Sequence, residues 1–229
     1  MSVNALLSES MKAPNRKITA AITVKTSDTG PTVARVFTLV DSGLSFPAAA
    51  QQVHIETGEQ TAGCNPAHRS APLAMMSQLD TQQLADYAKQ EAALTHHHPL
   101  SSDVASAVVV ICHQLVQGST WEKAIDSACT GRVPETVKAI SKPELESLKT
   151  GGFAPDVLAA AIYFVESSDS FNDALKRSLQ FAGPANHCPV LVGSIAGARW
   201  GMSSINRSLL EHCSILSRVQ AVAENLNSS

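Results

Sequence analysis

Aromatic and charged residues are scarce in this sequence of 229 residues, at 4% and 16% respectively. Hydrophobic residues make up 44% of the chain, which is enough for a buried core and too much for a disordered chain. The net charge is -3, so the chain lacks the broad cationic field on which binding to phosphates depends. We therefore expect a folded protein with no nucleic-acid partner.

Paired cysteines, a signal peptide and long apolar runs are also lacking. The five cysteines are odd in number, widely spaced and form no CxxC pair, which favours reduced thiols in the cytoplasm. The first residues lack the basic start, apolar centre and cleavage site of a signal peptide. The apolar stretches near residues 104–116 and 190–198 are shorter than the roughly 20 residues that span a bilayer. We expect cytoplasmic localisation and no membrane partner.

Helical periodicity dominates the remaining pattern and predicts an all-α fold. Apolar residues recur at steps of three and four residues in the stretches 104–115 and 157–165, and an amphipathic helix is expected over residues 214–225. Short polar residues three positions before a second polar residue predict further helix starts, at Asp80, Ser119 and Ser170. Residues 1–25 are expected to be an irregular segment and residues 26–229 a single helical domain.

Three loops carry polar residues that periodicity does not explain, and loops beside helices often carry function. In residues 25–30, Asp28 or Thr29 is a candidate helix cap before the apolar run 33–40. In residues 61–73, Arg69 either grips a phosphate or carboxylate or forms a surface ion pair. The third loop, residues 183–189, precedes Gly193 and Gly197, whose spacing indicates close helix packing.

The triplet His96, His97 and His98 could be taken for a metal site, because imidazole is a common zinc ligand. Neighbouring side chains point in different directions, however, so no more than two of the three could converge on one ion. A capped turn before Pro99 is the favoured interpretation.

Taken in order, these loops resemble the motifs of the ADP-ribosylglycohydrolase family over most of the chain. The resemblance implies a compact all-α fold with a site for two magnesium ions, whose ligands come from a TDDT and a GGDTDT motif. An NG..MR.APL loop and a TH..P segment border the substrate cleft in that family. The matching stretches here are residues 26–29, 68–73, 95–99, 151–153 and 183–201.

The departures from the family motifs fall on the metal ligands. Ser27 stands at the first aspartate of TDDT, whereas Pro184 and Asn186 stand at the two aspartates of GGDTDT, and His187 replaces the final threonine. Magnesium requires hard oxygen ligands and is normally held by carboxylates, of which only Asp28 remains by this comparison. The resemblance implies magnesium, but we expect a degenerate site that holds no metal and no other cofactor.

Three functions stay open at this point. The favoured one is a metal-free pseudoenzyme that binds a small-molecule or ADP-ribosyl-like ligand, or another protein. The second is an enzyme with altered chemistry, in which a histidine acts as base, activates a cysteine, or holds a softer ion such as zinc with Asp28 and a cysteine. The third is a retained hydrolase of ADP-ribosyl bonds. The candidate catalytic residues are Asp28, Cys64, His96, His187 and Cys188. The candidate ligand-binding residues are Thr26, Ser27, Thr29, Asn65, His68, Arg69, Gly152, Phe153 and Asn186.

Because the chain begins close to the TDDT-like stretch, we expect the family's leading helix, with its GD..G signature, to be missing before residue 26. Apolar surface that this helix would cover is therefore expected to be covered by a second copy of the chain, which predicts a homo-oligomer such as a dimer.

Overall fold

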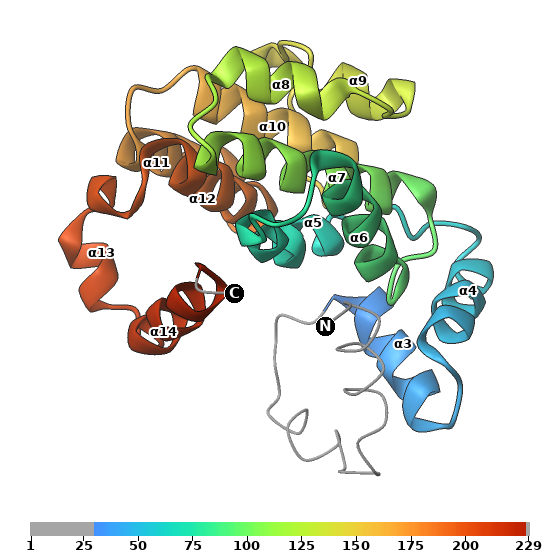
Figure 1. The fold of residues 1–229 in the computed structure, drawn as a ribbon. Helices are drawn as coiled ribbons and strands as arrows, with labels where there is room; N and C mark the ends of the chain where they lie inside the picture. Colours follow the sequence, from blue (N-terminus) through green and yellow to red (C-terminus); the bar gives the residue numbers. More distant parts are fainter. Residues whose placement is uncertain (1–29, 228–229) are drawn as a thin grey trace.

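Short loops connect the helices throughout the part of the chain that the computed structural model describes, residues 30–227 (Figure 1). The α-helices are α3 (Pro31–Asp41), α4 (Phe46–Glu56), α5 (Asn65–Ser70), α6 (Thr81–Ala93), α7 (Pro99–Val116), α8 (Trp121–Cys129), α9 (Pro134–Ile140), α10 (Ala154–Glu166), α11 (Phe171–Ala182), α12 (His187–Trp200), α13 (Arg207–Glu211) and α14 (Leu216–Asn227). Three 3₁₀ turns are η1 (Ala71–Met75), η2 (Leu145–Ser147) and η3 (Met202–Ser204). The described residues contain no strand beyond one isolated β-bridge. The expected all-α fold is confirmed.

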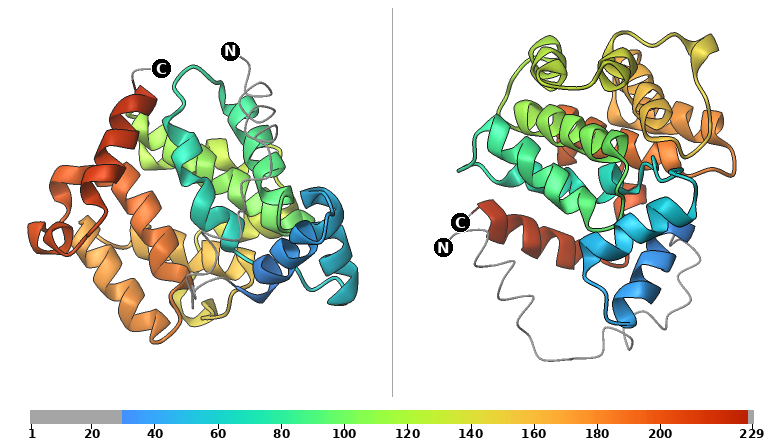
Figure 2. Two further views of the ribbon diagram at one scale, coloured as in Figure 1. Left: turned by 90° about the horizontal axis from the view of Figure 1, so that it is seen from below. Right: turned by 90° about the vertical axis from the view of Figure 1, so that its right-hand side faces the viewer.

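Helix α7 is the centre of the main core, where it contacts α5, α6, α8, α10 and α12 (Figures 1 and 2). Almost every side chain from Ser101 to His113 is buried. Its 18 residues have a mean hydropathy of 1.4, so α7 is long and apolar enough to cross a membrane by length and composition. Because 72% of that stretch is buried inside the structure, its apolar character also matches that of a core helix.

Two of the predicted helix starts are confirmed by their capping hydrogen bonds. Asp80 and Gln83 form a reciprocal capping box, in which each side chain accepts from the backbone N–H of the other, at 2.8 and 3.0 Å. Ser170 accepts from the N–H of Asp173 at 3.2 Å and begins α11. These oxygens satisfy helix amides that have no partner within the helix.

The start predicted at Ser119 is wrong by one residue. Thr120 is the N-cap of α8 and accepts from the N–H of Lys123 at 3.3 Å. The Ser119 hydroxyl instead donates to Gln114 Oε1 at 2.8 Å. Serine and threonine are both good N-caps by type, so residue type alone does not decide between these two neighbours.

The histidine triplet does cap a helix, as expected, and does not converge on one point. His98 Nδ1 accepts from the N–H of Leu100 at 3.2 Å at the start of α7. His97 is exposed and its ring lies 5.1 Å from that of His54, whereas His96 is buried. Only His96 of the three faces the cleft described below.

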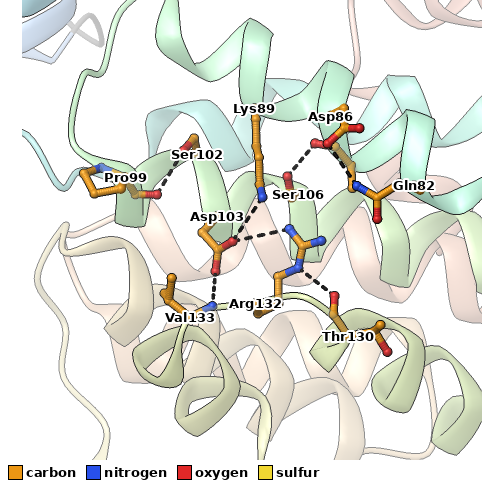
Figure 3. A network of polar contacts seen from close by, with 11 residues as sticks. Gln82, Asp86, Lys89, Pro99, Ser102, Asp103, Ser106, Thr130, Arg132 and Val133 are labelled. Atoms are coloured by element: carbon orange, nitrogen blue, oxygen red, sulfur yellow. Dashed lines mark hydrogen bonds and ion pairs between the residues drawn. The ribbon is translucent and has the colours of Figure 1, made fainter.

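A buried ion pair joins three elements on one side of α7 (Figure 3). Asp103 on α7 accepts from Arg132 Nη1 at 3.4 Å and from the N–H of Val133 at 3.0 Å, just before α9. The side chains of Asp103 and Arg132 are only 5% and 3% exposed. Lys89 of α6 approaches the same carboxylate at 3.7 Å but is 39% exposed. The carboxylate therefore fixes the loop after α8 against α7.

Helices α3 and α4 form a hairpin with an apolar cluster of its own, separate from the main core (Figure 1). Its buried members are Val36, Leu39, Ala49, Ala50 and Val53. Gly30, which has no side chain, is the N-cap of α3. The cap position predicted for Asp28 or Thr29 is therefore occupied by Gly30. Residues 1–29, which include the predicted irregular segment and the TDDT-like stretch, lie outside the described residues.

The glycines of α12 do not have the packing role predicted for them. A Cβ atom placed on Gly193 or Gly197 would meet no other atom within 4 Å. Neither position is a close approach between helices, so the four-residue spacing of these glycines says nothing about packing in this fold.

Candidate functional site

A cleft of about 440 Å³ lies where α3, α5, α10 and α12 begin and where the chain enters α7. Helix and loop ends, rather than helix faces, thus supply the residues around it. The lining residues are Gly30, Pro31, Thr32, Gly63, Cys64, Asn65, His68, His96, Gly152, Asn186, His187 and Val190. Its size is typical of small-molecule sites, which span about 300–1,000 Å³.

Backbone hydrogen bonds hold the floor of the cleft in place. Gly63 and Phe153 form the isolated antiparallel bridge, in which the N–H of Cys64 donates to the carbonyl of Gly152 at 3.1 Å. The buried Ser101 hydroxyl of α7 lies 3.0 Å from the carbonyl of Thr61 and 2.9 Å from that of Gly63. The loop before α5 is therefore fixed both to the start of α10 and to the central helix.

Two glycines allow imidazole rings to lie directly against this floor. A Cβ atom at Gly63 would lie 3.1 Å from His96 Nε2, and one at Gly152 would lie 3.3 Å from His187 Nε2. Both distances are shorter than ordinary side-chain contacts, so any larger residue would displace the rings. The absence of a side chain at these two positions sets where both histidines sit.

Cys64, His68 and His187 form a compact group of nitrogen and sulfur atoms. One ligand atom from each lies within 4.8 Å of the other two. The rings of His68 and His187 are stacked, with centroids 5.9 Å apart and an interplanar angle of 22°. His187 Nδ1 is buried and has no hydrogen-bond partner in the described part of the chain. These three side chains can face one small ligand or ion together.

Arg69 does not reach the cleft, so its expected role as a ligand clamp is not supported. Its Nε donates to Glu91 Oε1 at 2.6 Å and its Nη2 donates to Thr95 Oγ1 at 2.8 Å. Thr95 Oγ1 in turn lies 2.9 Å from His96 Nδ1. The ion pair between α5 and α6 thus orients His96 through a threonine, and the alternative of a structural ion pair describes Arg69.

Burial keeps two ionisable groups of the cleft, His96 and Cys64, in their neutral forms. Burial, aided by the charge of Arg69, lowers the pKa of His96 to about 4, so its ring is uncharged at neutral pH. Burial raises the pKa of Cys64 to about 12, so its thiol stays protonated. A thiol in this state is a poor nucleophile. His96 and Cys64 therefore offer the cleft uncharged hydrogen-bonding groups.

Six of the expected site residues in addition to Cys64 line the cleft: Asn65, His68, His96, Gly152, Asn186 and His187. Two further candidates, Phe153 and Cys188, do not line the cleft, and neither does Arg69. Phe153 is 43% exposed and does not line the cleft, because it is the N-cap of α10 and its backbone forms the bridge. Cys188 is buried in the main core, and burial raises the pKa of its thiol to about 12. Thr26, Ser27, Asp28 and Thr29 lie outside the described residues.

Sequence reasoning missed five lining residues: Gly30, Pro31, Thr32, Gly63 and Val190. Three of them, Gly30, Pro31 and Gly63, lie at or directly beside glycines of the loops already singled out, and Thr32 follows Pro31, so glycine next to a polar motif was the available signal. Val190 is one helical turn after Asn186, and the N–H of Val190 donates to the Asn186 carbonyl. That spacing places Val190 on the same face of α12.

The described residues do not fit the two magnesium ions that the sequence resemblance implies. The described residues that line the cleft supply imidazole nitrogens, a thiol, amides and a hydroxyl, and none of them carries a carboxylate. Pro184 is exposed in the turn before α12 and does not line the cleft. Because magnesium requires hard, preferably anionic oxygen ligands, we derive no step through this metal.

Comparisons with known proteins agree with this architecture. The ADP-ribosylarginine hydrolase Tri1 of Serratia proteamaculans is 27% identical over 175 residues, which cover 74% of this chain and 48% of that protein. The ADP-ribosyl-[dinitrogen reductase] glycohydrolase of Rhodospirillum rubrum is 24% identical over 149 residues, covering 64% of this chain and 49% of that protein. The chain thus spans about half the length of the curated relatives it matches.

A solved structure of an ADP-ribosylglycohydrolase-related protein complex has the same fold. It aligns with a TM-score of 0.67 and 20% identity, covering 86% of this chain and 72% of the other. The sequence profile that describes ADP-ribosylglycohydrolase matches residues 6–229. This match takes in all but the first five residues, and the chain therefore belongs to the ADP-ribosylglycohydrolase family.

Proposed function

We propose that this chain binds an ADP-ribose-like ligand in the cleft and does not perform two-magnesium hydrolysis. The observation that carries the proposal is the chemistry of the described lining residues: they supply imidazole, amide, hydroxyl and thiol groups and no carboxylate, in a cleft of about 440 Å³. Such a site can hydrogen-bond hydroxyl groups of a ribose. Because none of the described lining residues has an anionic oxygen, they lack the usual means of holding magnesium against a glycosidic bond.

The start of α12 adds a feature that suits an anionic ligand. Asn186, His187 and Val190 bring the first turn of this 14-residue helix to the cleft. Helix N-termini carry partial positive charge and favour phosphate or carboxylate groups. The partial positive charge of this helix start can bind an anionic group in place of Arg69, whose guanidinium forms an ion pair with Glu91.

Calorimetric titration with ADP-ribose, in magnesium chloride and in EDTA, tests this proposal. We expect the same affinity in both buffers, because no magnesium-dependent contact is involved. Asn186→Ala should raise the Kd about 5- to 10-fold, corresponding to about 1 to 1.4 kcal/mol for a lost hydrogen bond. Asn206→Ala is the matched control, since Asn206 is the N-cap of α13 and does not line the cleft.

An activity assay on ADP-ribosylated arginine peptides distinguishes the alternatives. The names of the curated relatives favour retained hydrolysis as a second candidate. Release of ADP-ribose that requires magnesium and stops in EDTA would overturn the proposal in favour of that activity. Release that persists in EDTA but is lost in Cys64→Ala would instead indicate altered chemistry based on the cysteine and its neighbouring histidines.

A further inference from the structure

We infer that Cys64, His68 and His187 form a binding site for one transition-metal ion, and that zinc(II) is the ion that these ligands fit best. The inference goes beyond the proposed ligand binding and does not depend on it. It also differs from the expectation that the cleft holds no metal, since that expectation rested on the loss of the magnesium ligands.

The geometry is close to that of a bound ion. A tetrahedral zinc with Zn–N near 2.1 Å and Zn–S near 2.3 Å separates its ligand atoms by about 3.3–3.8 Å. The three atoms here lie within 4.8 Å of one another, so a contraction of about 1 Å would complete the site. Rotation about side-chain bonds supplies shifts of this size without moving the backbone.

The backbone presets the three ligands. The N–H of His68 donates to the carbonyl of Cys64 at 3.2 Å, which makes the two residues neighbours one helical turn apart on the same face. His187 is the first residue of α12, and its ring is held beside Gly152. Two helix starts, each fixed by the fold, thus aim their ligands at one point.

His187 Nδ1 gives an independent reason to expect an occupant. This buried nitrogen has no hydrogen-bond partner in the described part of the chain, although buried polar atoms are normally paired. A coordinated ion would satisfy it. The alternative, in which Cys64 and the two rings only fill space, leaves this atom unpaired.

The ligand types select the metal. Thiolate and imidazole bind zinc and similar borderline ions, whereas magnesium and calcium require oxygen ligands. Binding would form a bond between Cys64 Sγ and the ion as the S–H bond breaks, and the thiol proton would pass to solvent. One thiolate and two neutral imidazoles leave a single net positive charge on bound zinc. With three protein ligands, a fourth position remains for water or a ligand oxygen.

Titration of the purified 229-residue chain with cobalt(II), without ADP-ribose, tests the site. We expect a thiolate-to-cobalt charge-transfer band that saturates at one equivalent, that zinc abolishes and that excess magnesium leaves unchanged. Cys64→Ser should remove the band. His68→Ala and His187→Ala should each weaken zinc binding by about 100-fold or more, since even indirect contacts to a metal are worth 10- to 100-fold.

Cys213→Ser and His97→Ala are the matched controls, because both residues are exposed and lie outside the cluster. Both should titrate like the unmodified chain, and circular dichroism in EDTA should show that every variant is helical. The inference is overturned if the unmodified chain gives no charge-transfer band, or if Cys64→Ser gives the same band. If a variant does not fold, the presence or absence of the charge-transfer band in the unmodified chain decides whether the site binds the metal. Because ADP-ribose is absent, failure here leaves the proposed function standing.

Discussion

His96 shows how a single residue in this cleft responds to its surroundings. Its ring is 3% exposed, lies against Gly63, and is fixed by Thr95, which in turn accepts from Arg69. Burial and the nearby guanidinium both disfavour a second proton on the ring. His96 is therefore neutral wherever the protein is folded above pH 4, and it can serve a ligand only as a hydrogen-bonding group.

This perturbation predicts an acid-sensitive contribution of His96 to stability. The folded pKa of about 4 is lower than the reference value of 6.5, so between these values the unfolded chain binds the proton first. Stability should therefore fall as the pH drops from about 6.5 to 4, by about 3 kcal/mol from this residue. Urea denaturation of the unmodified chain and of His96→Gln at pH 7 and pH 4 measures the difference.

His97→Gln is the control for this experiment, because His97 is exposed beside the same turn. This variant should keep the full pH dependence of the unmodified chain. Equal pH dependence in His96→Gln and in the unmodified chain would show that His96 does not cause the loss.

The sequence identified most of the residues of the site, but it did not show which of their side chains point into the cleft. Polar residues in loops identified Cys64, His68, His96 and His187, all of which line the cleft. Arg69 was misjudged because consecutive residues on a helix point about 100° apart, so the neighbour of a cleft residue commonly faces elsewhere. The side chain of Arg69 points away from the cleft because α6 places Glu91 beside it, which the local sequence around Arg69 does not show.

At the level of the helices, periodicity and capping predicted most of the elements, because both depend on nearby residues. The capping box at Asp80 needs only its own turn. The roles of Asp103 and Ser101 could not be predicted in this way. Asp103 binds Arg132 before α9, and the Ser101 hydroxyl donates to the loop before α5. Partners this distant in sequence are brought together only by the packed fold.

Because Asp103 and Arg132 form a buried ion pair, we expect the loss of Asp103 to destabilise the fold far more than the loss of its exposed partner Lys89. Asp103→Ala should destabilise the fold by about 3–5 kcal/mol, because it leaves a buried guanidinium without its counter-charge. Lys89→Ala removes a half-exposed partner of the same carboxylate and should cost less than about 1 kcal/mol. Denaturant unfolding of both variants checks the difference.

Asp86→Ala provides the matched control, since Asp86 is an exposed aspartate on α6 whose only described bond is with Gln82. Its effect should be close to zero. If Asp103→Ala were as mild as Asp86→Ala, the buried pair would not be what holds the loop before α9.

Across the whole molecule, composition and periodicity indicated the class of fold, and the family motifs indicated its architecture. The division of the apolar residues into a main core around α7 and a second cluster between α3 and α4 was not predictable. Hydrophobic patterning shows which face of a helix is buried but not what covers it. For the same reason the expected homo-oligomer stays a prediction. Helix α14 exposes the apolar residues Val219 and Val222, but their exposure does not show what covers them.

The separate cluster of α3 and α4 predicts uneven local stability. The hairpin has only five buried side chains, its other apolar contacts (Val40, Leu44 and Phe46) are partly exposed, and its ion pair between Arg35 and Glu56 is solvent-exposed. Amide hydrogen exchange should therefore be faster in α3 and α4 than in α7, whose residues are buried on nearly all sides. Similar protection of the three helices in native-state exchange would contradict this.

Gly30, Pro31 and Thr32 form one wall of the cleft and belong to the beginning of that hairpin. Transient detachment of α3 would thus widen the entrance while the opposite side, built on α7 and α12, keeps its shape. The rates of ligand association and dissociation would then depend on how often α3 and α4 detach. A mutation of the alanines in their cluster would change the residence time of a ligand without changing any residue that contacts it.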